Sequence, residues 1–186
     1  MVIGGIDPGL KGGIGFIDLE AQTLCVYRMP VFKRALATTT KTEVDGLTLA
    51  EILRRHKPDE IWVEDVFAFG GKRGSNQRQD GVVGAFSFGH GKGVLAGTIA
   101  GALGLRPRYV PAASWKGTLR VPSDKVASVA RAQHLLQGCA HLLTNDGLAE
   151  GALIALYGAI QGGARVGRLL QSPCQPSGRR SARRAS

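Results

Sequence analysis

Short apolar runs separated by turn residues make up the beginning of the chain. They predict three strands, at about 2–7, 12–19 and 23–29, with turns at Pro8-Gly9 and near 20–22. Connections this short join antiparallel neighbours. The sequence therefore begins with a predicted antiparallel three-stranded unit.

Apolar residues take up helical spacing further along the chain. A loop rich in Thr and Lys at 38–42 precedes a predicted helix at 46–56, and an apolar strand follows at 60–66. A helix that leads into a strand implies a crossover connection and a parallel pairing. These elements predict an α/β fold with a mixed sheet.

Small residues characterise the next predicted helix, at about 81–103. Gly93, Gly97 and Gly101 recur at four-residue intervals on one face of it. Glycine lowers helix stability, so a glycine face indicates that another backbone approaches closely. The sequence leaves two neighbours open for this face: the protein's own sheet and a second subunit.

Three further elements complete the predicted domain. They are a strand near 108–110, a helix at about 123–137 and a last helix at about 145–161. The expected N-cap residues are Ser123 for the first of these helices and Thr144 or Asn145 for the second. A chain of 186 residues with one such set of elements predicts a single domain with its own core.

Positive charge is concentrated near the end of the chain. The formal net charge is +10, and residues 165–186 contain six arginines and no acid. After Leu170 the sequence has almost no apolar residues and contains Pro173, Pro176 and four serines, and such a segment cannot bury enough surface to become ordered. We therefore predict a folded domain at 1–163 and a basic, disordered tail at 164–186. The tail is either a solvated terminus or an arm that binds polyanions in a salt-sensitive manner.

The sequence does not predict a membrane protein. Its N-terminus leads directly into a strand rather than into a signal peptide. The longest apolar stretch, at 94–105, is too short to span a bilayer. The three cysteines lack the spacing of zinc ligands. We expect a soluble, cytoplasmic protein.

Acidic residues occur at the ends of three elements that are far apart in the sequence. Asp7 ends the first strand, Glu64 ends a later apolar strand, and Asp146 and Glu150 begin the last helix. A buried, unpaired carboxylate is costly unless it is neutralised or binds a cation. The i, i+4 spacing places the two helical acids on one face. If that face packs over the strand ends, four carboxylates converge.

Clustered carboxylates are hard oxygen ligands, which suit Mg²⁺ or Mn²⁺ better than zinc. Two such ions would activate a water molecule and stabilise a leaving oxygen, which is the two-metal route to phosphodiester hydrolysis. Each acid alone is weaker evidence, as Asp65 shows: it adjoins Glu64 but points to the opposite face of a strand. The four acids together predict a site for two divalent ions and no further cofactor.

Five separated segments carry a resemblance to a known family. They are Ile6-Asp7-Pro8-Gly9, Glu64 with Val66-Phe67, the stretch from Phe86-Ser87-Phe88-Gly89 to Gly93-Val94, residues 111–116, and Asp146-Gly147-Leu148-Ala149-Glu150. In this order they resemble the RuvC-like Holliday junction resolvases, and the phage-type branch most closely. The resemblance extends from about residue 3 to residue 158.

The resemblance implies an RNase H-like fold, with three antiparallel N-terminal strands followed by parallel strands and flanked by helices. It also implies a homodimer that uses divalent metal to nick two opposing strands of a four-way junction, in the cytoplasm of a bacterium or a phage-infected host. The implied catalytic metal ligands are Asp7, Glu64 and Asp146, with Glu150 in the place of the family's last acid. Bacterial members carry two aspartates three apart in that motif, whereas this chain has Asp and Glu four apart. We expect Asp146 to be essential and Glu150 to be slightly less important.

The resemblance further implies side chains that contact DNA. Lys116 and Lys125 resemble basic residues near the scissile phosphate, where an ammonium group would stabilise the pentavalent phosphate. Phe67 resembles the aromatic residue inserted into the opened junction, and Phe69 is a second candidate. Cationic and amide side chains are expected to contact the DNA backbone. They are Lys72, Arg73, Asn76, Gln77, Arg78 and Lys92.

The leading hypothesis is a metal-dependent endonuclease that resolves branched DNA by paired hydrolysis in opposing strands. One alternative with the same fold is a nuclease that cuts flaps, forks or RNA–DNA hybrids. The other is a non-enzymatic junction-binding protein. The sequence signature of the latter would be a neutral residue in place of an acid, and the four positions 7, 64, 146 and 150 are all acidic.

Overall fold

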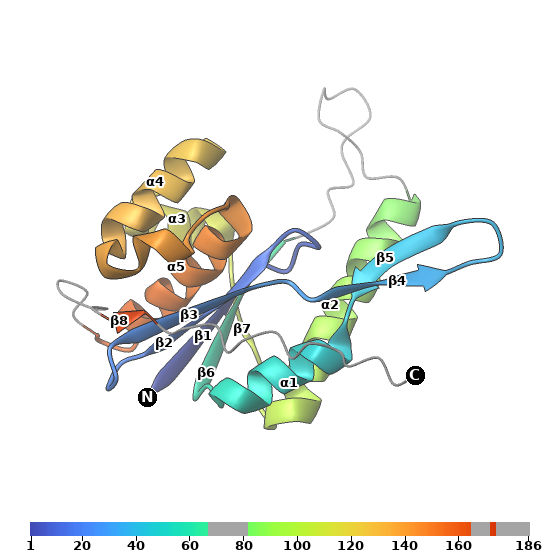
Figure 1. Cartoon of the computed structure of the whole chain (residues 1–186), viewed down its shortest axis with the longest axis horizontal. Coiled ribbons are helices and arrows are strands. Elements are labelled where there is room, and N and C mark those ends of the chain that lie inside the picture. The colour runs from blue at the N-terminus through green and yellow to red at the C-terminus, as the bar shows by residue number, and fades with distance from the viewer. Residues whose placement is uncertain (67–81, 165–171, 174–186) are drawn as a thin grey trace, which may run out of the picture.

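The computed structural model of the chain describes residues 1–66, 82–164 and 172–173. Six strands form one mixed sheet in the order β7-β6-β1-β2-β3-β8 (Figure 1). They are β1 (Val2–Ile6), β2 (Gly13–Asp18), β3 (Thr23–Arg28), β6 (Glu60–Glu64), β7 (Arg108–Val110) and β8 (Ser172–Pro173). β1, β2 and β3 are antiparallel neighbours, and β6 and β7 extend the sheet in parallel from β1. The predicted fold class is therefore confirmed.

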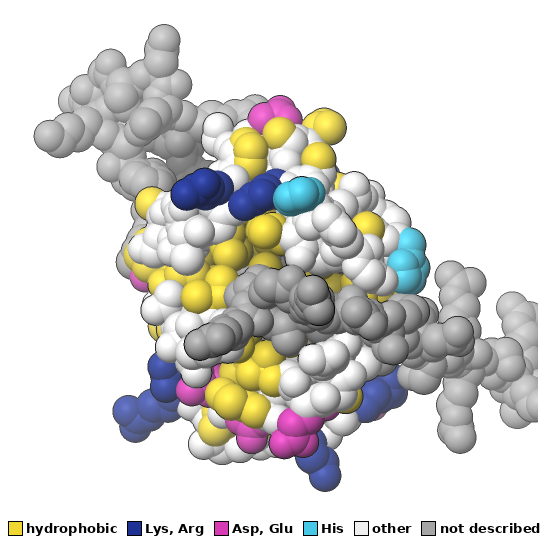
Figure 2. Space-filling model, turned by 90° about the vertical axis from the view of Figure 1, so that its left-hand side faces the viewer, with side chains coloured by type: hydrophobic (Ala, Val, Ile, Leu, Met, Phe, Trp, Pro, Cys, Tyr) yellow, Lys and Arg dark blue, Asp and Glu magenta, His cyan; other side chains and the backbone are white. Residues whose placement is uncertain are grey.

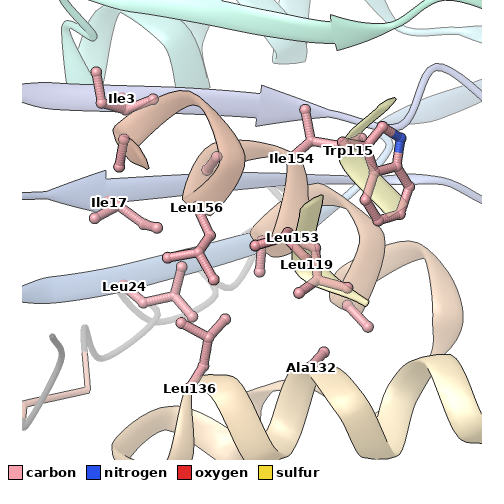
Figure 3. Close-up of a cluster of buried hydrophobic side chains, with 14 of the residues drawn as sticks. Ile3, Ile17, Leu24, Trp115, Leu119, Ala132, Leu136, Leu153, Ile154 and Leu156 are labelled. Carbon is pink, nitrogen blue, oxygen red and sulfur yellow. The ribbon is translucent and has the colours of Figure 1, made fainter. Parts of the chain in front are cut away.

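Helices lie on both sides of the sheet (Figure 1). One side carries α1 (Gly46–His56) and α2 (Val82–Leu103), and the other carries α3 (Ala112–Leu119), α4 (Lys125–Leu135), the 3-10 helix η1 (Gln137–Leu142) and α5 (Asp146–Gln161). Each side has its own hydrophobic cluster. Leu53 and Ile99 pack with Ile6 in one of them. Ile17 and Leu153 belong to the other, which Figure 3 shows.

The close packing of α5 on the sheet depends on glycine. A Cβ atom at Gly15 of β2 would lie 2.7 Å from the Cα atom of Ala152, and one at Gly5 of β1 would overlap the backbone of Ala155. A side chain at either position would push the helix away from the strands. These glycines therefore set the distance between α5 and the two central strands.

The N-caps of two helices on that side are asparagine and aspartate. Asn145 accepts a hydrogen bond of 3.0 Å from the N–H of Leu148, which confirms the predicted last helix with Asn145 as its cap. Asp124 caps α4 by accepting a hydrogen bond of 2.8 Å from the N–H of Ala127. The prediction of Ser123 as the cap is therefore wrong. A carboxylate also interacts favourably with the positive end of the helix dipole, which a hydroxyl group does not.

A β-hairpin occupies a segment that the sequence predicted to be a loop. β4 (Val31–Ala35) and β5 (Thr40–Val44) pair antiparallel in a separate two-stranded sheet. Arg34 and Glu43 join the two strands through two hydrogen bonds of 2.9 Å. The loop prediction fails here because polar side chains pair across two strands that pack little on the core. The hairpin extends away from the main sheet beside α2 (Figure 1).

The glycine face of α2 does not pack on the protein's own sheet. Within the described part of the chain, a Cβ atom at Gly93, Gly97 or Gly101 would meet nothing within 4 Å. Leu95 and Ile99, on another face of the same helix, are buried in the core instead. The protein's own sheet is therefore excluded as the neighbour of this face, and a second subunit is the neighbour that remains.

Several predicted features lie outside the described residues. They are Phe67, Phe69, Lys72, Arg73, Asn76, Gln77, Arg78 and most of the tail at 164–186. Within the predicted tail, Ser172 and Pro173 form β8, which pairs in parallel with the start of β3. None of the described helices has the length and hydropathy needed to cross a membrane.

Candidate metal centre

The ends of two parallel strands place two acids at one edge of the sheet. Asp7 directly follows β1, and Glu64 is the last residue of β6. These strands pair in parallel, with Ile6 opposite Val63, so their carboxyl ends meet at the same edge. α5 crosses β1 and β2 near this edge and adds Glu150. One carboxylate oxygen from each of Asp7, Glu64 and Glu150 lies within 4.8 Å of the others.

Asp146 lies beside this three-carboxylate group but does not belong to it. Its Oδ2 accepts a hydrogen bond of 2.5 Å from Nζ of Lys125, and the two side chains are 36% and 82% exposed. The negative charge of Asp146 nevertheless contributes to raising the pKa of Asp7. The sequence predicted Asp146 to be the more important helical acid. The structure instead brings Glu150 together with Asp7 and Glu64.

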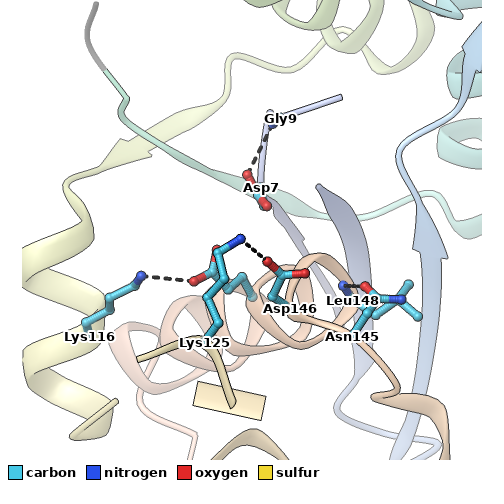
Figure 4. Close-up of polar contacts among 8 residues, drawn as sticks. Asp7, Gly9, Lys116, Lys125, Asn145, Asp146 and Leu148 are labelled. Carbon is cyan, nitrogen blue, oxygen red and sulfur yellow. Dashed lines mark hydrogen bonds and ion pairs between the residues drawn. The ribbon is translucent and has the colours of Figure 1, made fainter. Parts of the chain in front are cut away.

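The turn after β1 holds the side chain of Asp7 in place. Oδ1 of Asp7 accepts a hydrogen bond of 3.1 Å from the N–H of Gly9, as Figure 4 shows. A Cβ atom at Gly12 would lie 2.8 Å from Cγ of Asp7, so only glycine leaves room for the carboxylate in this turn. The Asp-Pro-Gly segment therefore both ends the strand and orients its acid.

Burial makes the three-carboxylate group electrostatically unfavourable without a cation. Desolvation raises the pKa of Asp7 to about 6, and the nearby charges of Glu150 and Asp146 add to this effect. Desolvation also raises the pKa of Glu64, with further contributions from Asp7 and Glu150. A divalent cation would offset this excess of negative charge. Its preferred ligands are carboxylate oxygens, so the donor set fits Mg²⁺ or Mn²⁺.

Two lysines pair with the two acids of α5. Nζ of Lys116, in α3, donates a hydrogen bond of 2.9 Å to Oε1 of Glu150. Lys125, the first residue of α4, bonds Asp146, and this hydrogen bond lowers the pKa of Asp146. Figure 4 shows both lysines reaching towards the acids of α5 from neighbouring elements. The structure thus places both sequence-predicted lysines at the site.

Lys92, in α2, lies beyond the end of β6, and its ammonium group bonds to other residues of the protein. Its Nζ donates to Oδ1 of Asp65 at 3.1 Å and to the carbonyl oxygen of Val66 at 3.0 Å. It also lies 5.4 Å from the centre of the Tyr109 ring. The predicted contact between Lys92 and DNA stays a prediction. Asp65, which the sequence separated from the catalytic acids, pairs with Lys92 and is not in the three-carboxylate group.

Trp115 is a residue of the site that the sequence interpretation missed. It is fully buried in α3, and its indole N–H has no hydrogen-bond partner within the described structure. The same group lies close enough to the Glu64 carboxyl to lower its pKa, although it is outside hydrogen-bonding geometry. The feature of the sequence that could have indicated Trp115 is its position next to Lys116.

The fold resembles that of two solved protein structures. No protein-family model matches the sequence, and no curated protein matches it. Among solved structures, T. thermophilus RuvC in complex with a Holliday junction substrate is 18% identical, with a TM-score of 0.55. A second Thermus thermophilus RuvC structure is 19% identical, with a TM-score of 0.51. In both comparisons the match covers 87% of this chain and 95% of the other. The protein therefore has the RuvC-like, RNase H-like fold.

Proposed function

We propose that this protein is a metal-dependent endonuclease that resolves branched DNA by hydrolysing paired phosphodiester bonds in opposing strands. The observation that carries the proposal is the group of Asp7, Glu64 and Glu150, whose oxygens lie within 4.8 Å of one another. This group is built on the fold of RuvC, one structure of which contains a Holliday junction substrate.

Mg²⁺ or Mn²⁺ would be held by Asp7, Glu64 and Glu150, with Asp146 available beside them. Divalent ions in such a site supply an activated water and stabilise the leaving oxygen of a phosphodiester. The protein's own contribution is positional. The N–H of Gly9 orients Asp7, and partial burial reduces the screening of the site's charges by water.

The two lysines would bring positive charge to the scissile phosphate. Lys116 and Lys125 each lie within hydrogen-bonding distance of an acid of α5, so both ammonium groups are at the edge of the metal centre. A phosphate group that entered this edge would meet them directly. Their charge would then stabilise the negative charge that develops on the phosphate oxygens.

Contacts with the rest of the junction would come from the sheet edge where the site lies. Lys92 is at this edge, and Phe67, Phe69 and the cationic residues from Lys72 to Arg78 follow β6 in the sequence. Figure 2 shows a different face, on which described lysine and arginine side chains do not form one continuous patch. We therefore place branched DNA at the carboxyl ends of β1 and β6. The basic tail would add sequence-independent affinity.

A homodimer would account for paired cleavage. The glycine face of α2 is open in the described structure, and a second copy of the chain could bring its own helix close to it. Two subunits would present two metal centres to the two opposing strands of a junction. The phage-type branch of the family remains our preferred assignment within this proposal.

A cleavage assay on a synthetic four-way junction tests the proposal. We expect paired nicks with Mg²⁺ or Mn²⁺ and none with chelator. The Asp7→Asn variant should lose cleavage and retain junction binding, whereas Glu51→Gln, at an exposed position of α1, should cleave as the wild type does. Comparison with a fork and an RNA–DNA hybrid separates junction resolution from broader nuclease activity. Binding without metal-dependent cleavage would favour the non-enzymatic alternative.

A further inference from the structure

We propose that Trp115 is a positioning residue of the metal centre, whose indole N–H donates to Glu64 when that carboxylate binds a divalent ion and whose ring supports Lys116. The inference rests on the metal site of the proposed function. It assigns a role to a side chain that neither the acidic motifs nor the basic motifs include.

The first observation is an unpaired donor in the protein interior. Among the described residues, the buried side-chain polar atoms without a hydrogen-bond partner are Nε1 of Trp115 and Oγ of Ser128. A buried, unpaired N–H lowers stability, because it gives up its hydrogen bond to water and gains none in return. Such groups are rare, and each calls for an explanation, of which a functional role is one. Trp115 has no exposed surface, so water does not satisfy this donor.

The chain path brings this donor to the metal centre. β7 pairs with β6 so that Val110 lies opposite Glu64. α3 begins directly after Pro111 and places Trp115 one turn later, beside the end of β6. In Figure 3 the indole nitrogen points away from Leu153 and Leu119 of the hydrophobic cluster. The ring packs in the core, and the indole N–H lies close enough to the Glu64 carboxyl to lower the pKa of that group.

The second observation is that the same ring contacts the charge network of α5. Nζ of Lys116 lies 5.0 Å from the centre of the Trp115 ring, within the range of a cation–π interaction. The same Nζ donates to Glu150 at 2.9 Å. Trp115 therefore links two acids that come from different elements. Its N–H group acts on the pKa of Glu64 of β6, and its ring lies beside the lysine that pairs with Glu150 of α5.

A purely structural tryptophan would need its ring but not its N–H group. Trp62 provides the matched comparison within the same protein. Its ring is also buried, and its Nε1 donates to Oε2 of Glu60 at 3.2 Å, at the opposite end of β6 from Glu64. Its ring packs on Tyr157, away from the acids. Phenylalanine at either position keeps an aromatic ring and removes the donor.

Nuclear magnetic resonance of the ¹⁵N-labelled full chain tests the inference, because the chain contains two tryptophans and thus two indole N–H signals. The Trp62→Phe variant leaves only the Trp115 signal. We expect this signal to move downfield as Mg²⁺ is added, since a hydrogen bond to a carboxylate deshields the proton. This measurement does not require any change at Trp115.

Calorimetric titration with Mg²⁺ then measures the consequence for binding. Trp115→Phe should weaken Mg²⁺ binding about tenfold, as expected for the loss of a hydrogen bond to a charged ligand, and Trp62→Phe should bind as the wild type does. If Mg²⁺ moves the amide signals of Gly9 and Glu150 but leaves the Trp115 indole unchanged, the inference is wrong and the metal site stands. If Mg²⁺ moves none of these signals, the metal site itself is wrong.

Discussion

Lys116 and Glu150 form an ion pair of 2.9 Å that joins α3 to α5 at the edge of the metal centre. Their side chains are 28% and 19% exposed, so solvent screens the pair only partly. The ammonium group offsets one of three carboxylates that lie within 4.8 Å of one another. The negative charge that remains favours protonation of an acid or binding of a cation at this group.

Removing the charge of Asp7 should stabilise the metal-free protein. Because burial raises the pKa of Asp7 from 3.8 to about 6, its stabilising contribution is complete below pH 3.8 and is lost as the pH rises through 6. Asp7→Asn should therefore be more stable than the wild type by roughly 1–3 kcal/mol at pH 7, measured by urea denaturation with chelator present. The difference should shrink towards pH 4.

The matched control is Glu51→Gln, which removes a carboxylate from the exposed side of α1 and should change stability by less than about 0.5 kcal/mol. Addition of Mg²⁺ should reverse the order of wild type and Asp7→Asn, since only the wild type keeps the full ligand set. An Asp7→Asn protein that is less stable than the wild type in chelator at pH 7 would contradict the assignment.

Glu150 should contribute more to metal binding than Asp146 does. Glu150 belongs to the three-carboxylate group, whereas Asp146 is more exposed and bonds Lys125. Glu150→Gln should weaken Mg²⁺ affinity about tenfold or more, and Asp146→Asn should weaken it less, because removing a charged ligand lowers affinity directly. Calorimetric titration of the two isosteric variants decides the order. The opposite order would favour the assignment that the sequence suggested.

A large side chain on the open glycine face of α2 should prevent dimer formation without unfolding the monomer. Gly97→Leu has room in the described structure and replaces a residue with low helix propensity. We expect a monomer by light scattering at micromolar concentration, with an unchanged circular dichroism spectrum. Gly117→Leu is the control, because this α3 position is also open but lies on a different helix. A wild-type protein that is itself monomeric would contradict the proposed dimer.

A methyl group between β1 and α5 should be strongly destabilising. The Cβ atom of Gly5→Ala would overlap the backbone of Ala155, and neither main chain can move without disturbing the core. We expect a loss of at least about 3 kcal/mol in the free energy of unfolding. Gly117→Ala, at an open helical position, should instead be neutral or slightly stabilising. Equal effects of the two changes in thermal denaturation would show that α5 does not pack as described.

The sequence was sufficient to predict most, but not all, of the elements that pack on the core. β1 to β3, α1 and α5 have clear apolar spacing, and this spacing also located the strand ends that carry Asp7 and Glu64. The hairpin of β4 and β5 could not be predicted in the same manner. Its strands are stabilised by polar pairs such as Arg34 with Glu43, which have no apolar period.

The choice between Asp146 and Glu150 depends on how α5 is rotated over the sheet. Cβ atoms at Gly147 and Gly151 would overlap the backbone of Gly12 and Gly13, so contacts between distant glycines set that rotation. The local spacing i, i+4 places both acids on one face but does not select between them. Trp115 was missed for a different reason: no helix was predicted at the position of α3.

Anomalous X-ray diffraction from crystals grown with Mn²⁺ tests the central claim most directly. A peak is expected among the carboxylate oxygens of Asp7, Glu64 and Glu150, and it should be absent in Asp7→Asn crystals prepared in the same way. A protein without Mn²⁺ at these three side chains, or with Mn²⁺ bound only elsewhere, would contradict the account.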